Sequence, residues 1–208
     1  MGQMITITLR GGIEIQNQLE VALQFLGSYT SYEACESSGA RSFDERDLRR
    51  ANRGGARISA AEIDAILERR PEIERSLRAI PARASLTATP GSIPWRPLTR
   101  LFDAFADIRG VGFSKMTKAL HPKRPALIPM LDSVVQAYLT RDEPETPSSR
   151  SFGERSVALV WSYKSDLDRN RRALRELRRE LVKRGYATTE VRILDLLIWT
   201  AEEAVKPR

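Results

Sequence analysis

The chain has almost no cysteine and almost no histidine. Cys35 and His121 are the only residues of their types among 208. A single cysteine cannot form an internal disulfide, which is typical of proteins in the reducing cytoplasm. With one histidine, a zinc site would rest on carboxylates, and a Ser/His/Asp triad on His121 alone. We therefore expect a cytoplasmic protein without a metal site, in which His121 belongs to a supporting loop between two helices.

Long apolar runs are also lacking. No stretch of about twenty apolar residues is present, so no membrane span is expected. The first twelve residues are too polar and too short to be a secretory signal. Basic residues outnumber acidic ones, 34 against 27, which gives a formal net charge of +7. An excess of this sign favours an anionic partner, although it also serves solubility.

Apolar residues recur at helical spacing along most of the chain. Alternating residues over 4–9, a turn at Gly11-Gly12, and Ile13 and Ile15 beyond it predict a small N-terminal β-hairpin. The remainder favours a mostly α fold, built as a two-lobed helical bundle. The helices are expected at 19–26, from 60, from 71, at 98–105, 113–120, 133–140, at 157–182 with a break near 165–170, and at 190–204.

A polar stretch at 141–153 is the best boundary between the two lobes. It separates a central segment, 97–140, from a C-terminal helical part, 153–208. We expect the C-terminal part to pack back on the N-terminal part. The whole chain, 1–208, is thus predicted to be one two-lobed module and a monomer.

The central segment contains a helix, a tight turn and a second helix. The turn is Ile108-Arg109-Gly110-Val111-Gly112, and Phe113 begins the second helix. Glycines allow the sharp bend and a close approach to another surface. A helix that opens on glycines presents unpaired N–H groups and a positive dipole end, which suit a phosphate.

Four cations lie close to this turn along the chain: Lys115, Lys118, Lys123 and Arg124. Together with Arg109, Gly110, Val111 and Gly112 they are the candidate contacts to a nucleic-acid backbone, made without reading its sequence. The alternative is an ordinary corner between two helices, in which the glycines only serve the bend.

A second motif follows the turn. Asp132 opens a helix twenty positions after Gly112. The segment 98–138, about a fifth of the chain, resembles the helix-hairpin-helix DNA glycosylase superfamily, with IRGVGFS as the hairpin and PMLDSVV as the segment that carries the aspartate. The resemblance implies that Asp132 is the catalytic carboxylate beside an extruded nucleotide. It also implies that DNA is the partner and that a monovalent cation aids the hairpin's grip.

Ser114 stands two residues past the second glycine of the hairpin. In bifunctional members of the superfamily a lysine at this place forms a Schiff base with the sugar, whereas serine resembles the monofunctional members. Lys115 lies about 100° further round the helix and should not substitute for it. The resemblance therefore implies a monofunctional enzyme, with Asp132 and Ser114 as the catalytic positions.

The segment also departs from the superfamily's pattern. Val134 and Ala137 stand where members often have a histidine or other polar residue and an arginine. Some members carry an iron–sulfur cluster on four cysteines, which one cysteine excludes. Four aromatic residues are candidates for the wall of a base pocket: Trp95, Tyr138, Trp161 and Phe43. Buried core positions are the more common setting for such residues.

Three interpretations remain open. The first is a monofunctional DNA glycosylase that removes a damaged or modified base and leaves an abasic site. The second is a non-catalytic helix-hairpin-helix DNA-binding protein, which Val134 and Ala137 favour. The third is an unrelated helical interaction protein, in which the glycines form a corner and Asp132 is a helix cap.

Overall fold

The computed structural model describes residues 5–28, 38–141 and 150–205. Within these ranges it contains ten α-helices and one two-stranded antiparallel sheet, which confirms the mostly α fold with a small N-terminal β-hairpin. Strands β1 (Ile7–Thr8) and β2 (Glu14–Ile15) pair with Ile7 opposite Ile15. The expected Gly11-Gly12 turn joins them, and both glycines take a positive φ, at 69° and 73°.

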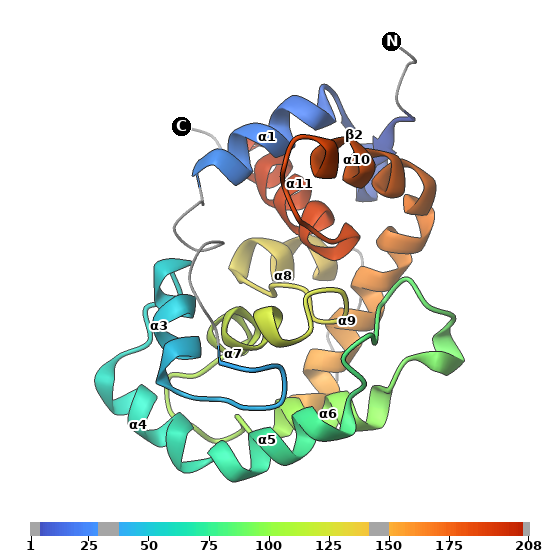
Figure 1. The fold of residues 1–208 in the computed structure, drawn as a ribbon. Helices are drawn as coiled ribbons and strands as arrows, with labels where there is room; N and C mark the ends of the chain where they lie inside the picture. The colour runs from blue at the N-terminus through green and yellow to red at the C-terminus, as the bar shows by residue number, and fades with distance from the viewer. Residues whose placement is uncertain (1–4, 29–37, 142–149, 206–208) are drawn as a thin grey trace.

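The first and last parts of the chain form one group of helices (Figure 1). Helix α1 (Gln18–Ser28) contacts both α10 (Arg171–Lys183) and α11 (Glu190–Val205). All residues of α11 from 191 to 198 are buried. A helix that is buried on every side holds the middle of a packed core, as its apolar sequence predicts. Thr189 accepts a hydrogen bond from the Arg192 backbone N–H at 3.1 Å and so caps this helix.

A second group of helices lies below the first in the same view (Figure 1). It comprises α3 (Glu45–Arg53), α4 (Ala60–Glu68), α5 (Arg70–Ala79), α6 (Trp95–Asp103) and α7 (Phe113–Leu120). Capping boxes start α3 and α4: Asp44 pairs with Asp47, and Ser59 with Glu62. The second of these begins the helix that the sequence predicts from residue 60, and Ser59-Ala60-Ala61-Glu62 has the Ser-x-x-Glu pattern typical of a capping box.

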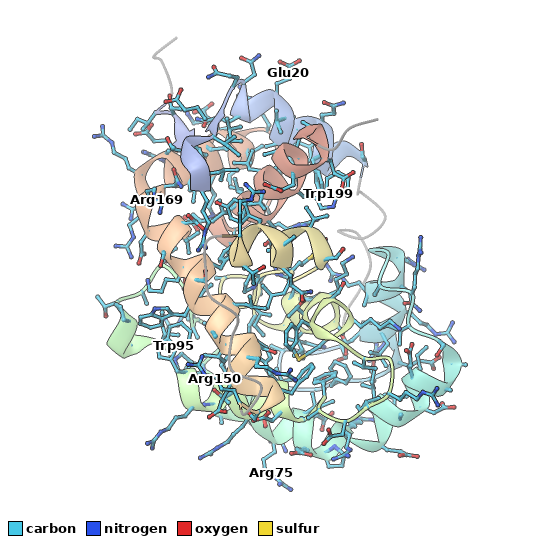
Figure 2. The ribbon with its side chains drawn as sticks, turned by 180° about the vertical axis from the view of Figure 1, so that it is seen from behind. Glu20, Arg75, Trp95, Arg150, Arg169 and Trp199 are labelled. Atoms are coloured by element: carbon cyan, nitrogen blue, oxygen red, sulfur yellow. The ribbon has the colours of Figure 1, made fainter. Side chains whose placement is uncertain are left out.

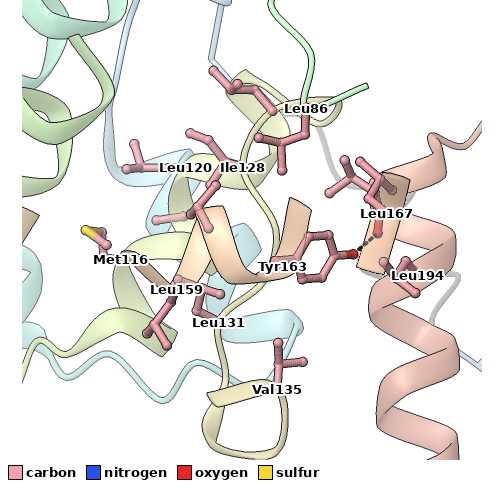
Figure 3. Close-up of a cluster of buried hydrophobic side chains, with 14 of the residues drawn as sticks. Leu86, Met116, Leu120, Ile128, Leu131, Val135, Leu159, Tyr163, Leu167 and Leu194 are labelled. Carbon is pink, nitrogen blue, oxygen red and sulfur yellow. Dashed lines mark hydrogen bonds between the residues drawn. The ribbon is translucent and has the colours of Figure 1, made fainter. Parts of the chain in front are cut away.

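Helices α8 (Ser133–Thr140) and α9 (Phe152–Arg169) connect the two groups. Helix α8 contacts α11 and α9, and α9 packs along α6. Figure 3 shows the buried side chains where these elements meet, among them Met116 of α7, Val135 of α8, Tyr163 of α9 and Leu194 of α11. One continuous core therefore fixes the central segment against the C-terminal helix.

The predicted break after α9 lies at Asn170. Its side chain accepts a hydrogen bond from the Thr8 N–H and donates one to the Thr8 carbonyl, both at 2.9 Å. The break therefore serves to hold strand β1. Gly153, expected in a linker, instead lies in the first turn of α9, where a Cβ would meet the Thr99 carbonyl of α6 at 2.3 Å. Glycine at this position lets the two helices approach closely.

Several expectations fall on residues outside the described ranges, namely Cys35 and most of the boundary at 141–153. Short 3₁₀ helices lie in three of the connections within the described ranges: η1 (Arg10–Gly12), η2 (Pro90–Ser92) and η3 (His121–Lys123). Within the described residues, no helix combines the length and apolar character that crossing a membrane requires.

Candidate functional site

The hairpin between α6 and α7 is a tight turn. The Ile108 carbonyl accepts a hydrogen bond from the Val111 N–H at 3.0 Å, and Gly110 between them has a φ of 82°. Val111 is buried and anchors the turn, while Arg109, Gly110 and Gly112 are exposed. Gly112 is the N-cap of α7 and supplies no capping side chain. The first N–H groups of α7 therefore open on a surface that a phosphate can approach.

Glu62 of α4 holds the hairpin from one side. Its two carboxylate oxygens accept hydrogen bonds from the Lys115 ammonium at 2.6 and 2.8 Å. A Cβ on Gly110 would meet Glu62 Oε1 at 2.2 Å, so a side chain there would displace this carboxylate. Lys115, predicted as a DNA contact, is thus engaged by an acid within the fold.

Asp132 is the N-cap of α8. Its Oδ1 atom accepts hydrogen bonds from the backbone N–H groups of Val134 and Val135 at 3.1 and 3.0 Å. The residue before it, Leu131, donates its N–H to the Thr117 hydroxyl of α7 at 2.9 Å. The second helix of the hairpin therefore positions the segment that carries the carboxylate. Asp132 is half-buried.

Asp132 lines a small cavity between the two groups of helices. The cavity measures about 70 Å³ and is lined by Phe25 of α1, Gly54 after α3, Lys118 of α7, Met130, Asp132, Val135 of α8, and Arg192, Asp195 and Trp199 of α11. Ligand pockets commonly measure roughly 300–1,000 Å³. This cavity therefore has room for a few water molecules until its walls move.

Two cations and two acids face the cavity. Burial lowers the pKa of the Lys118 ammonium, while Asp132 opposes the shift and the charges of Arg192 and Arg57 add to it. Burial raises the pKa of Asp195 to about 8, against the opposing charge of Arg192. Arg192 also lies 5.4 Å from the centre of the Phe25 ring. Lys118, predicted at the DNA backbone, is thus brought together with Asp132.

Two predicted DNA contacts are wrong, because Lys123 and Arg124 are buried. Lys123 forms an ion pair with Asp47 Oδ1 at 2.6 Å, and both side chains are fully inaccessible. Arg124 donates hydrogen bonds to the carbonyls of Ala40, Lys123, Leu77 and Ile80. Both residues connect loops and helix ends inside the fold. A buried charge is costly unless it is paired and hydrogen-bonded, and these contacts supply the partners.

Two of the candidate pocket aromatics belong to the core. Phe43 is fully buried and packs edge-on against Phe105, with ring centroids 6.0 Å apart. Tyr138 is fully buried too, and its hydroxyl accepts a hydrogen bond from the Arg10 N–H at 2.9 Å. Neither residue lines the cavity beside Asp132. The structure therefore places both rings in the core, away from the cavity at Asp132.

The other two aromatics form a separate groove. Trp95 and Trp161 pack against each other with ring centroids 5.0 Å apart. They line a hollow of about 470 Å³ between α6 and α9, with Arg150 and Glu154 at its edge. Figure 2 shows Trp95 well apart from Trp199, which lines the cavity at Asp132. The two tryptophans therefore lie outside the candidate site.

His121 has a structural role in the connection that follows α7. It lies between α7 and the segment of Asp132, and its Nδ1 atom is 2.6 Å from the Ile128 carbonyl. Burial lowers its pKa to about 3. The ring is therefore neutral near pH 7 and unsuited to proton transfer there. Ser114 is half-buried in the first turn of α7 and is not part of the cavity wall.

Of the nine residues that line the cavity, sequence reasoning identified only Lys118 and Asp132 as site residues. Four of those that it missed are Phe25, Arg192, Asp195 and Trp199. The sequence contains a pattern that could have identified two of them. Arg192 and Asp195 are charged residues within the otherwise apolar run VRILDLLIW of α11. Charged residues are almost never fully buried without a specific reason. Within the described residues, no group of three histidine, cysteine, aspartate or glutamate side chains could hold a metal ion.

Comparison with known proteins shows the family of the chain. The model of a family described as "Family of unknown function (DUF6308)" matches residues 24–202, which include every residue that lines the cavity. No curated protein and no solved structure matches the chain. Because the match covers most of the sequence, the chain belongs to the DUF6308 family.

Proposed function

We propose that this protein is a monofunctional DNA glycosylase. It would hydrolyse the N-glycosidic bond of a damaged or modified base that has been extruded from DNA, and leave an abasic site. The observation that carries the proposal is the position of Asp132. The helix that follows the hairpin braces its segment, and its carboxylate lines a cavity with Lys118 and Arg192.

The chemistry needs a carboxylate at this place. Breaking the bond between sugar and base builds positive charge on the sugar, which a nearby anion stabilises. The same carboxylate can take a proton from the attacking water. Among the described residues the hydrogen bonds to Asp132 all end on Oδ1. The second oxygen is therefore the one available to the sugar and the water.

The base itself requires the cavity to widen. Phe25 and Trp199 are half-buried at its wall, with ring centroids 5.6 Å apart in an edge-on arrangement. Extruding a nucleotide costs a few kcal/mol, which stacking of the flipped base on aromatic rings offsets in part. We propose that these two rings part to admit the base.

The exposed part of the hairpin would hold the DNA backbone. Arg109, Gly110 and Gly112 are exposed there, whereas Lys115 is engaged by Glu62. Arg57, which follows α3, is also exposed, and its charge reaches Lys118. These groups would contact phosphates and fix the strand, without reading its sequence.

The test is the substitution Asp132→Asn. Asparagine is as good an N-cap as aspartate, so the fold is retained. With a panel of duplexes, each bearing a different modified base, we expect the wild type to leave alkali-labile sites in at least one. The variant should bind that duplex equally but release no base. Asp64→Asn, at an exposed position of α4, is the matched control and should behave as the wild type.

Two outcomes would count against the proposal. Equal base release by Asp132→Asn and the wild type would remove the catalytic role of this carboxylate. We also expect no strand cleavage before alkali, because serine stands at position 114. A borohydride-trapped covalent adduct that is lost in Lys118→Gln would instead assign a lyase step to the lysine in the cavity.

The small size of the cavity favours one alternative, a non-catalytic DNA-binding protein that kept the hairpin. A volume of about 70 Å³ does not admit a base as the walls stand. The same panel separates the two functions. Binding of duplex DNA without any alkali-labile product, across all modified bases, would favour the alternative.

A further inference from the structure

Helix α11 carries an acid at the inner wall of the cavity. Asp195 is 3% exposed, and its Oδ2 atom accepts a hydrogen bond from the Met130 N–H at 3.1 Å. The other oxygen, Oδ1, is buried and makes no hydrogen bond of ordinary geometry with a described residue, although the Tyr163 hydroxyl lies near enough to the carboxyl to lower its pKa somewhat. Leaving a polar atom unsatisfied inside a protein is costly, so such an atom indicates a task beyond stability.

Three charged or titratable groups act on the Asp195 carboxyl. Arg192 lies one turn earlier on α11, Asp132 faces it from α8, and Tyr163 lies beside it on α9. Lys118 of α7 lines the same cavity, and α1 contributes only the uncharged Phe25. Burial is the largest influence on the carboxyl, and the like charge of Asp132 acts in the same direction, so its pKa rises to about 8. The Asp195 carboxyl is therefore protonated at pH 7.

Two other titratable groups near the cavity, Tyr163 and His121, are poor proton donors. Burial holds the pKa of the Tyr163 hydroxyl well above 10, and its proton is donated to the Val191 carbonyl at 2.6 Å. His121 is neutral near pH 7 and has its Nδ1 atom on the Ile128 carbonyl. Asp195, in contrast, has a buried oxygen that no geometric hydrogen bond occupies, and its carboxyl carries the proton that a donor needs.

We propose that Asp195 is the proton donor of this site and acts on the departing base while Asp132 acts on the sugar and the water. The inference rests on the proposed glycosylase function. Two acids in one cavity can hold different protonation states when their surroundings differ, and this divides the acid and base roles between them.

The proposed reaction conserves atoms and charge. The bond between C1′ of the sugar and the base nitrogen breaks, and its electron pair stays with the base. The proton of Asp195 moves to the base, which leaves neutral. The water oxygen bonds to C1′, and its proton moves to Asp132. Transfer of that proton to Asp195, directly or through solvent, restores the starting state.

The experiment that tests this role measures the rate of single-turnover base release by the wild type and by Asp195→Asn over a range of pH. We expect the rate at pH 7 to fall roughly 100-fold or more, the usual contribution of a general acid. The wild-type rate should decline as pH rises through about 8, the pKa of Asp195, and the variant should lack this decline. DNA binding should be unchanged, and Asp64→Asn again serves as the control.

A second measurement does not depend on activity. The carbonyl stretch of a protonated carboxyl in the infrared spectrum should be present at pH 7 and absent in Asp195→Asn. The pH at which half of this band has disappeared should be lower in Asp132→Asn, because the like charge beside Asp195 is gone. Absence of the band in the wild type would overturn the inference even if base is released. Base release by Asp195→Asn at the wild-type rate and pH profile would overturn it too.

The two failures are distinguishable. If the wild type releases no base from any duplex, the proposed function fails, and the donor role falls with it, whatever the infrared band shows. If base is released but Asp195 is ionised at pH 7 or is dispensable, the glycosylase stands and the assignment of its proton donor is wrong.

Discussion

The four basic residues that follow the hairpin look alike in sequence, but their side chains lie in different environments in the fold. Lys123 and Arg124 are buried, Lys115 is held by Glu62, and Lys118 lines the cavity. Because all four lie close to the glycines in sequence, the pattern indicated that they share one DNA-binding surface. Burial, however, is decided by partners far along the chain, such as Asp47 for Lys123. Local pattern cannot identify these partners, so the individual roles could not be predicted.

The substitution Lys123→Met tests the structural role of this ion pair. It would leave Asp47 buried without its countercharge, so we expect the free energy of unfolding to fall by roughly 3–5 kcal/mol. Urea denaturation gives this value. Lys183→Met is the control, because that side chain is 69% exposed and should change stability by no more than about 0.5 kcal/mol. A fully stable Lys123→Met protein with weakened DNA binding would restore the original interpretation.

Elements with a strong local start signal could be predicted closely. Helices α7 and α8 span the residues expected from the glycines and from Asp132, since each signal acts within one turn. Helix α6 begins earlier than expected, at Trp95, with Pro97 in its first turn. The role of Gly153 could not be foreseen, because it depends on how closely α9 approaches α6.

A substitution in the hairpin between α6 and α7 tests whether this element holds DNA. A Cβ on Gly112 meets nothing within 4 Å, and its φ of −96° is open to any residue. In Gly112→Val the side chain would therefore project toward the bound backbone. We expect weaker binding to every duplex alike, with a stability loss of no more than about 1 kcal/mol from the poorer N-cap.

The matched control is Gly91→Val in η2, which also has open space around it and lies outside the hairpin. Its DNA affinity should equal that of the wild type. Fluorescence anisotropy with labelled duplexes measures both variants. If Gly112→Val and Gly91→Val bind equally well, the hairpin is not the element that holds DNA.

At the scale of the whole molecule, the site is assembled from distant parts of the chain. Asp132 was predicted, but the residues opposite it come from α1 and α11, near the two ends. No local motif links Phe25 to Arg192 and Asp195. Their meeting follows from the packing of α1 on α11, which is a property of the core. The sequence therefore indicated one half of the cavity only.

The overall charge of +7 gives a further prediction. Neutralising phosphates releases counterions, so the logarithm of the DNA affinity should fall linearly with the logarithm of salt concentration. We expect a loss of roughly tenfold or more between about 50 and about 200 mM salt. Titrations of an unmodified duplex measure the slope. An affinity that is independent of salt would contradict backbone binding by this protein.

The Arg10 side chain has a consequence for how the protein is made. Its guanidinium donates to Asp166 Oδ2 at 2.7 Å, to the Leu139 carbonyl at 2.8 Å, and to the Ser162 carbonyl at 2.8 Å. Arg10 and Asp166 are 156 positions apart. Arg10 leaves the ribosome long before these acceptors exist, so the turn that carries it cannot dock until residue 166 has been made. The N-terminal β-hairpin can therefore make these contacts only after α8 and α9 have emerged.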